Sequence, residues 1–301
     1  MGQLLTNLNS QQLSHWLTEA SQAANKGKLP NYIPLLQQTP PNLLAVCILP
    51  INHQINAQGD IDKTFPLMSI IKPFLLFYLL SQLGKEFIFN KVGRDPSNYP
   101  FNSLEQLQID QGFPRNPMIN SGAITLASLL LGKDGKTRCQ NLQKWLNKQA
   151  NCNLFLDEFM LNSVQSLPNI RNQSILQELV KQNQINEPEI TLDTYNHICC
   201  LSGTIIDLAR LGLLLVNCPS SLSQENCLIV REIMTTCGLY EASDTFAKKV
   251  GFPTKSGVSG AILSLVPEEG AIACYSPALD AEGNSISSLF IIQKIAQFLA
   301  S

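Results

Sequence analysis

The alternation of apolar and polar residues predicts regular elements at both ends of the chain. Residues 8–24 place their apolar side chains on one helical face, and residues 43–51 form an apolar run of strand length between prolines. Residues 52–60 are polar and rich in turn-forming residues, so a turn is expected there. Residues 286–301 again carry one apolar helical face, which predicts a closing helix.

The middle of the chain has helical periodicity, whereas strand-length runs return after residue 245. The expected middle helices cover residues 140–149, 157–164, 172–183, 192–201 and 204–216. The expected late strands cover residues 246–252, 260–266 and 270–276. This order predicts an α/β (α+β) fold, in which an antiparallel sheet built from both termini is flanked by helices and carries an all-helical insert. We expect one catalytic region, 1–301, with a sheet-containing subdomain (1–67 plus 245–301) and a helical subdomain (68–244).

Composition and charge narrow the class of protein. The chain has 301 residues, 45% of them hydrophobic, and its formal net charge of −2 gives no reason to expect nucleic acid or a membrane as partner. Its nine cysteines are scattered and its three histidines are not at ligand spacing, so neither a metal nor another cofactor is predicted. No secretory signal is recognised, and the cysteines are therefore interpreted as reduced thiols of a cytoplasmic protein.

The apolar run 65–80 contains one serine and one lysine, Ser69 and Lys72, three residues apart. On a helix these positions share a face. Pro73 cannot donate a hydrogen bond to the carbonyl of Ser69, so the helix is expected to begin near Ser69. A lysine in apolar surroundings has a lowered pKa and can act as a base, which makes S-x-x-K a candidate activated nucleophile. The alternative is a serine that caps the helix and a lysine that extends to solvent.

A second segment, Lys255-Ser256-Gly257-Val258, resembles the K-T-G element of serine acyl-transfer enzymes, although alone it could be a simple turn. Acyl transfer needs backbone N–H groups directed at the developing oxyanion. We expect Ser69 and Val258 to supply them, because Gly257 allows the backbone to approach closely. Lys255 would add positive charge.

With these two elements in place, the chain resembles the glutaminase family, within the superfamily of serine-dependent β-lactamases and penicillin-binding proteins. The resemblance extends from about residue 27 to residue 288. The matching segments are Tyr32-Ile33-Pro34, Gly59-Asp60, Ser69-Ile70-Ile71-Lys72, residues 114–124, Arg171-Asn172, Tyr195 followed by Cys199, Asp207-Leu208-Ala209, residues 234–240, residues 255–258, Ser276-Pro277 and Leu279-Asp280-Ala281. Residues 114–124 and 234–240 are typical of glutaminases and not of β-lactamases.

The resemblance implies a β-lactamase-like fold and the hydrolysis of L-glutamine to L-glutamate and ammonia. Ser69 would attack the side-chain amide and Lys72 would act as the base. Tyr240 would be a second proton carrier beside them, and Tyr32 would line the site. Members of the family associate as dimers or tetramers, so the resemblance also implies a homo-dimer or homo-tetramer.

Substrate-binding residues follow from the same resemblance. Asn120, Asn172 and Tyr195 match positions that hold the α-amino and α-carboxylate groups, although each alone could be a helix cap or a core tyrosine. Gln165 stands seven residues before Asn172, where the family has a glutamate facing the ammonium. A neutral amide removes a charge-assisted hydrogen bond, so we expect weaker glutamine binding or a shifted substrate.

Two further hypotheses about the function remain open from the sequence. The chain could be a weakly active or inactive relative that acts as an amino-acid-binding or interaction protein, or an amidase with an altered substrate. A β-lactam-processing enzyme is the other reading, against which the glutaminase-type segments speak. Activation by phosphate or another anion is not decided by the sequence.

Overall fold

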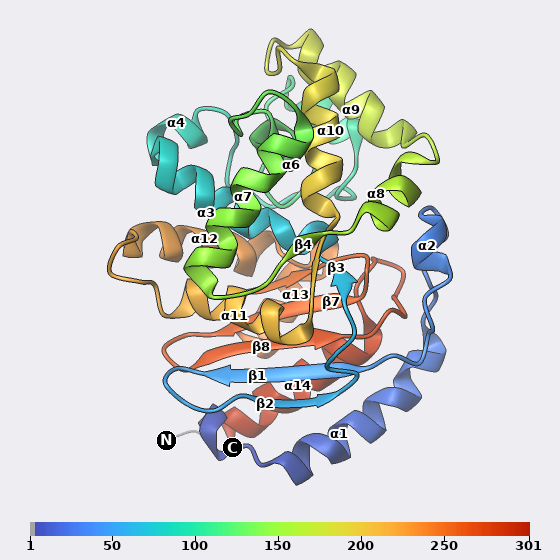
Figure 1. The fold of residues 1–301 in the computed structure, drawn as a ribbon, viewed down its shortest axis with the longest axis vertical. Helices are drawn as coiled ribbons and strands as arrows, with labels where there is room; N and C mark the ends of the chain where they lie inside the picture. Colours follow the sequence, from blue (N-terminus) through green and yellow to red (C-terminus); the bar gives the residue numbers. More distant parts are fainter. Residues whose placement is uncertain (1–3) are drawn as a thin grey trace.

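A five-stranded antiparallel sheet lies between two groups of helices in the computed structural model, which describes residues 4–301 (Figure 1). The strand order is β2-β1-β8-β7-β6. The strands are β1 (Ala45–Pro50), β2 (Asn56–Gly59), β6 (Thr254–Ser256), β7 (Ala261–Val266) and β8 (Gly270–Tyr275). The early strand β1 pairs directly with the late strand β8, Ala45 opposite Tyr275. The predicted antiparallel sheet from both ends of the chain is therefore confirmed. Residues 1–3 of the predicted segment 1–67 lie outside the described residues.

The strands are continuous apolar runs because both faces of the sheet are covered. Val46 and Ile48 of β1 belong to a buried cluster with Trp16, and this cluster is formed with α1 (Ser10–Ala23) and α14 (Ile286–Ala300). The alternate residues Ala45 and Cys47 belong to the larger core on the opposite face. Successive side chains of a strand point to opposite faces, so one strand serves both cores.

The helix α11 (Ile205–Val216) packs on the face of this sheet opposite α1 and α14, between the sheet and the helices in the upper part of Figure 1. Its first turn is closed by a capping box, in which the Thr204 hydroxyl and the Asp207 carboxylate satisfy backbone N–H groups. Gly212 allows the close packing, since a Cβ there would lie 2.6 Å from Cδ1 of Leu263. The helix α11 thus connects the sheet to the helical region.

Most of the remaining elements lie above the sheet in Figure 1, whereas residues 243–250 pack beside α14. The α-helices are α2 (Pro34–Gln37), α3 (Ile71–Leu83), α4 (Lys85–Phe89), α5 (Leu104–Ile109), α6 (Asn120–Ala127), α7 (Gly135–Ala150), α8 (Glu158–Gln165), α9 (Ile170–Lys181), α10 (Pro188–Cys199), α12 (Gln224–Cys237) and α13 (Ser243–Val250). The 3-10 turns are η1 (Leu5–Asn7), η2 (Ala24–Lys26), η3 (Met68–Ile70) and η4 (Tyr240–Ala242). A small second sheet has the order β3-β5-β4, from β3 (Phe65–Pro66), β5 (Leu201–Gly203) and β4 (Phe155–Leu156).

Three expectations are corrected. The strand predicted at 246–252 is wrong, because this segment belongs to α13, where Phe246 and Val250 are buried four residues apart and Gly251 ends the helix at φ 77°. The predicted turn at 52–60 contains the edge strand β2, which its polar sequence concealed. The middle region is not all helical, since β4 and β5 lie within it. The division into subdomains stays a prediction, and α11, from within 68–244, packs on the sheet.

Other structural features bear on the class of protein. Within residues 4–301 no helix is both long and apolar enough to cross a bilayer. The nine cysteines are free and buried. In that same part of the chain, no group of three or more histidine, cysteine or acidic side chains is placed to hold a metal ion.

Candidate active site

Ser69 lies in a sharp turn where the chain leaves β3 and enters α3. The preceding residue, Met68, has φ 47°, a left-handed conformation that costs free energy in a residue with a side chain. The turn η3 is followed directly by α3, which begins at Ile71. The helix start predicted near Ser69 is thus confirmed within two residues, with Pro73 in the first turn of α3, where its missing N–H costs nothing.

The amine of Lys72 is completely buried. Its Nζ donates to the carbonyl oxygen of Met118 at 3.0 Å and to Oδ1 of Asn120 at 2.8 Å. Burial lowers the pKa of Lys72 from 10.5 to about 8, and the nearby Cys199 acts in the opposite direction. The lowered pKa is what a general base in this position requires, because a larger share of the amine is neutral near pH 7.

Asn120, Asn172 and Tyr195 form one hydrogen-bonded group, although they come from three helices, α6, α9 and α10. Oδ1 of Asn120 accepts from the Tyr195 hydroxyl at 3.2 Å as well as from Lys72, and Nδ2 of Asn120 donates to Oδ1 of Asn172 at 2.8 Å. Asn169 caps α9 by accepting from the N–H of Asn172 at 3.1 Å. The predicted substrate-binding residues are therefore linked to the predicted base.

The Tyr240 hydroxyl lies beside the Ser69 hydroxyl. Tyr240 has φ 56°, and its ring lies against Phe101 with centroids 4.4 Å apart. Its hydroxyl donates to the carbonyl oxygen of Ser256 at 3.4 Å. Burial raises the pKa of Tyr240 to about 12, and hydrogen bonds with Ser69 and Ser256 partly offset this rise. The phenol is therefore protonated at neutral pH and can donate a proton beside Ser69.

The side chain of Lys255 supports the position of the Tyr240 ring. Its buried Nζ donates to the carbonyl oxygens of Gly238 at 2.9 Å and Ser256 at 2.7 Å, and lies 4.3 Å from the ring centroid of Tyr240. Burial lowers the pKa of Lys255 well below its ordinary value, with a second contribution from Lys72. Lys255 therefore joins the end of α12 to β6 and holds the Tyr240 ring.

Gly257 lets β6 run close to the serine turn. A Cβ at Gly257 would lie 2.8 Å from the carbonyl oxygen of Leu67 and 3.1 Å from Cγ1 of Ile70. Val258 follows immediately and faces the same pocket as Ser69. The Oγ of Ser256 is buried, and no residue in the described part of the chain forms a hydrogen bond with it. The close approach expected from the glycine is thus present.

These residues surround a hollow that is open to solvent. The residues that line it are Tyr32, Ile33, Met68, Ser69, Phe101, Asn120, Val164, Asn169, Asn172, Tyr195, Asn196, Cys199 and Val258. Six of the residues predicted from the sequence, Tyr32, Ser69, Asn120, Asn172, Tyr195 and Val258, therefore meet in one pocket. A hollow lined by apolar side chains together with a few hydroxyl and amide groups suits a small polar molecule.

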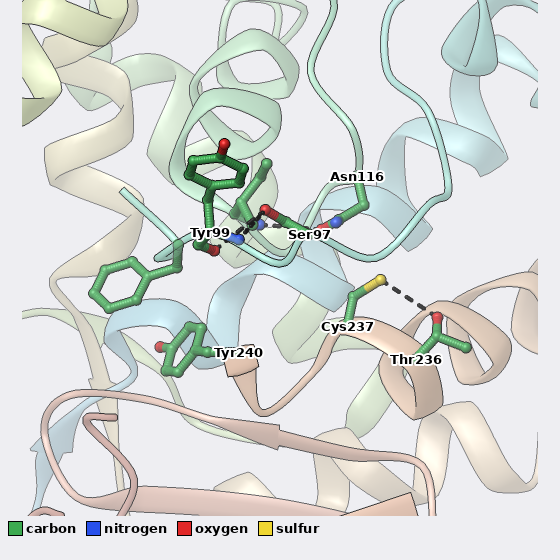
Figure 2. A pocket seen from close by; sticks show the side chains of 8 residues that line it. Ser97, Tyr99, Asn116, Thr236, Cys237 and Tyr240 are labelled. Carbon is green, nitrogen blue, oxygen red and sulfur yellow. Dashed lines mark hydrogen bonds between the residues drawn. The ribbon is translucent and has the colours of Figure 1, made fainter. Parts of the chain in front are cut away.

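A second hollow lies beside the first, on the other side of Phe101. Figure 2 shows its wall, which includes Ser97, Tyr99, Asn116 and Tyr240, and the contact of 3.3 Å between the Thr236 hydroxyl and the Cys237 sulfur. Phe101 lines both hollows. The carbonyl oxygen of Phe101 also accepts from the N–H of Asn120 at 2.8 Å, which fixes the loop over the site.

Gln165 is not brought into the pocket. Its side chain is exposed at the end of α8, and its Nε2 donates to Oδ1 of Asp193 at 3.2 Å. The neighbouring Val164 lines the pocket instead. Sequence reasoning did not select Phe101, which carries no motif signal and reaches the wall only through folding. Cys199, which belongs to the matching segments, also lines the pocket.

Comparisons with known proteins agree with this geometry. The family model described as Glutaminase matches residues 27–301. A glutaminase from Synechocystis sp. is 44% identical over 97% of this chain and 90% of its own length. A solved structure of a probable glutaminase from Bacillus subtilis matches with a TM-score of 0.89 at 28% identity, covering 99% of this chain and 98% of that one.

A further match is the covalent complex of a Bacillus subtilis glutaminase with 5-oxo-L-norleucine, formed by reaction with 6-diazo-5-oxo-L-norleucine. It has a TM-score of 0.86 and 28% identity, and the match covers 96% of this chain and 97% of that one. The β-lactamase-like fold expected from the sequence is confirmed by these structures. The chain belongs to the glutaminase family.

Proposed function

We propose that this glutaminase hydrolyses L-glutamine to L-glutamate and ammonia through an acyl-enzyme on Ser69. In the first step the Ser69 oxygen bonds to the side-chain carbonyl carbon, and the neutral Lys72 amine accepts the hydroxyl proton. Breaking the carbon–nitrogen bond, with a proton delivered to the leaving nitrogen, releases ammonia. Water then attacks the ester, which regenerates the Ser69 hydroxyl and frees glutamate.

Proton delivery to the leaving nitrogen is assigned to Tyr240, with Lys72 as the source of the replacement proton. The phenol is protonated at neutral pH because burial raises its pKa to about 12, and it is linked to the Ser69 hydroxyl. Its ring is held by Phe101 and Lys255. A fixed donor beside the reacting atoms contributes about 10²–10⁴-fold to such a step.

The backbone N–H groups of Ser69 and Val258 are assigned to the oxyanion. Both residues line the same pocket, and Gly257 allows the two segments to approach. Donors that are fixed before the reaction stabilise charge without reorganising, and loss of one such donor typically costs about 10²–10³-fold in kcat. Tyr32, Asn120, Asn172 and Tyr195 are assigned to the amino-acid end of the substrate.

One observation carries the proposal: Ser69 lies in a pocket whose amide wall is hydrogen-bonded to a buried lysine with a pKa of about 8. The test is ammonia release from glutamine by the wild-type protein and by Ser69→Ala. We expect the substitution to lower kcat by at least about 10³-fold while glutamine still binds. Treatment with 6-diazo-5-oxo-L-norleucine should add mass to the peptide that contains Ser69.

The alternatives give different results in the same assays. A protein that only binds amino acids would bind glutamine without releasing ammonia, and a β-lactam-processing enzyme would hydrolyse a chromogenic β-lactam. A glutaminase that uses another nucleophile would keep its rate and its mass adduct in Ser69→Ala. Any of these results would contradict the proposal.

Location and assembly are further parts of the proposal. The nine buried free thiols are compatible with a reducing compartment, which supports a cytoplasmic location. Assembly as a homo-dimer or homo-tetramer rests on the resemblance to the family. Fractionation and light scattering of the purified protein test these two statements.

A further inference from the structure

The wall of the active-site pocket carries no ionised side chain. Among the described residues that line it there is no aspartate, glutamate, lysine, arginine or histidine. Val164 presents an aliphatic side chain to the pocket and packs on the core beside it. An α-ammonium group that enters this pocket loses hydration, and its best compensation, a carboxylate, is missing from the wall.

Hydrogen bonds fix the amides of three of the four asparagines in the wall, Asn120, Asn169 and Asn172. Nζ of Lys72 and the Tyr195 hydroxyl both donate to Oδ1 of Asn120, and Nδ2 of Asn120 donates to Oδ1 of Asn172. Asn169 has its Oδ1 occupied by the N–H of Asn172. Three amide oxygens of the wall are therefore already accepting hydrogen bonds, while the Nδ2 group of Asn172 is left to donate to a carboxylate.

The charges just outside the pocket act in the same direction. Nη1 of Arg171 donates to Oδ1 of Asn102 at 3.3 Å, next to Phe101. Partial burial raises the pKa of Tyr32, and the positive charge of Arg171 opposes that rise, so the guanidinium acts electrostatically on a residue of the pocket wall. The carboxylate of Asp193, by contrast, is engaged outside the pocket by Gln165 and by His197.

We propose that this pocket recognises its substrate through the carboxylate and binds the α-ammonium only weakly, so that γ-carboxamides without a free amino group are also hydrolysed. The inference rests on the proposed function, because it concerns the substrate range of the same site. The chemical class is a short-chain amide that carries a carboxylate at the other end. Glutamine is one member, and its deamino analogue 5-amino-5-oxopentanoate is another.

The first test compares kcat/KM of the wild-type protein for these two amides. Neutral hydrogen bonds are worth about 1 kcal/mol each, so glutamine should be preferred by less than about tenfold. A preference for glutamine greater than about tenfold would overturn the inference, because it would show that the α-ammonium is specifically paired.

The second test places a carboxylate in the wall through Val164→Glu, with Val164→Gln as a control of the same size and no charge. A charge-assisted hydrogen bond to the ammonium should raise the preference for glutamine over the deamino analogue by about tenfold or more in the Glu variant alone. An unchanged preference in Val164→Glu, or an equal rise in both variants, would contradict the role given to this position.

A binding measurement separates this inference from the proposed reaction. Calorimetry on Ser69→Ala gives dissociation constants for both amides without turnover. If the wild-type protein released no ammonia from any amide, the proposed function would fail, and the ratio of the two constants would still decide the substrate range. A ratio within about tenfold supports the inference, whereas a larger ratio, or no binding of either amide, overturns it.

Discussion

The pH dependence of the reaction follows directly from the burial of Lys72. The amine must be neutral to accept the proton of Ser69, and burial lowers its pKa from 10.5 to about 8. At pH 7 the neutral share is then about one in ten, whereas at the ordinary pKa it would be about three in ten thousand. The fold thereby increases the concentration of the active base about 300-fold, which corresponds to about 3 kcal/mol.

The protonation of Lys72 also sets the direction in which the rate changes with pH. Below pH 8 the amine is protonated, so kcat/KM for glutamine should fall about tenfold for each unit of decreasing pH, and above it the rate should level off. The assay measures ammonia release between about pH 6 and 9.5. Lys72→Met keeps the length of the side chain and removes the base, so it should lower kcat/KM by about 10³-fold and abolish the acid limb.

Two results would refute this reasoning. One is a wild-type rate that does not change between about pH 6 and 9. The other is an acid limb of unchanged midpoint in the residual activity of Lys72→Met, which would assign the titration to another group. Circular dichroism and thermal unfolding of the variant serve as the control that it is folded.

Three other substitutions test separate parts of the site. Asn120→Asp places a carboxylate where Oδ1 of Asn120 now lies 2.8 Å from Nζ of Lys72. The substitution should therefore raise the pKa of Lys72 and move the acid limb of kcat/KM to higher pH. An unmoved limb would contradict the assignment of this limb to Lys72. Gly257→Ala forces a Cβ toward a carbonyl oxygen 2.8 Å away, so kcat should fall by at least about tenfold. The control Gly251→Ala meets open space at φ 77°, so it should cost only about 1 kcal/mol of stability and leave kcat unchanged. An equal change of kcat in the two variants would refute the packing argument. Gln165→Glu should leave KM for glutamine within about twofold of wild type, since this side chain points away from the pocket, and a marked fall in KM would restore the role predicted from the sequence.

The errors in the secondary-structure prediction share a physical cause. The segment 246–252 has strand length and apolar character, but its buried residues Phe246 and Val250 recur at helical spacing once Lys248 and Lys249 face outward. A short run does not reveal its period until the surface it packs against is known. The edge strand β2 is polar because it pairs with β1 on one side only, so its sequence resembles a turn.

The sequence by itself determined the elements that are encoded locally. These are the strand-length apolar runs that became β1, β7 and β8, the start of the helix near Ser69, which Pro73 sets, and the spacing that puts Lys72 on the same face as Ser69. It also contained the resemblance that selected most of the residues now found in the pocket, because a motif is a property of neighbouring positions in the chain.

Only the tertiary structure decided which side chains share the pocket and what their environment does to them. The choice between Val164 and Gln165 depends on the rotation of α8 against its neighbours, and a single residue of difference replaces a polar wall with an apolar one. The lowered pKa of Lys72 likewise requires that distant segments exclude water from the amine. Desolvation and side-chain orientation are properties of the packed chain, so no local pattern of residues can specify them.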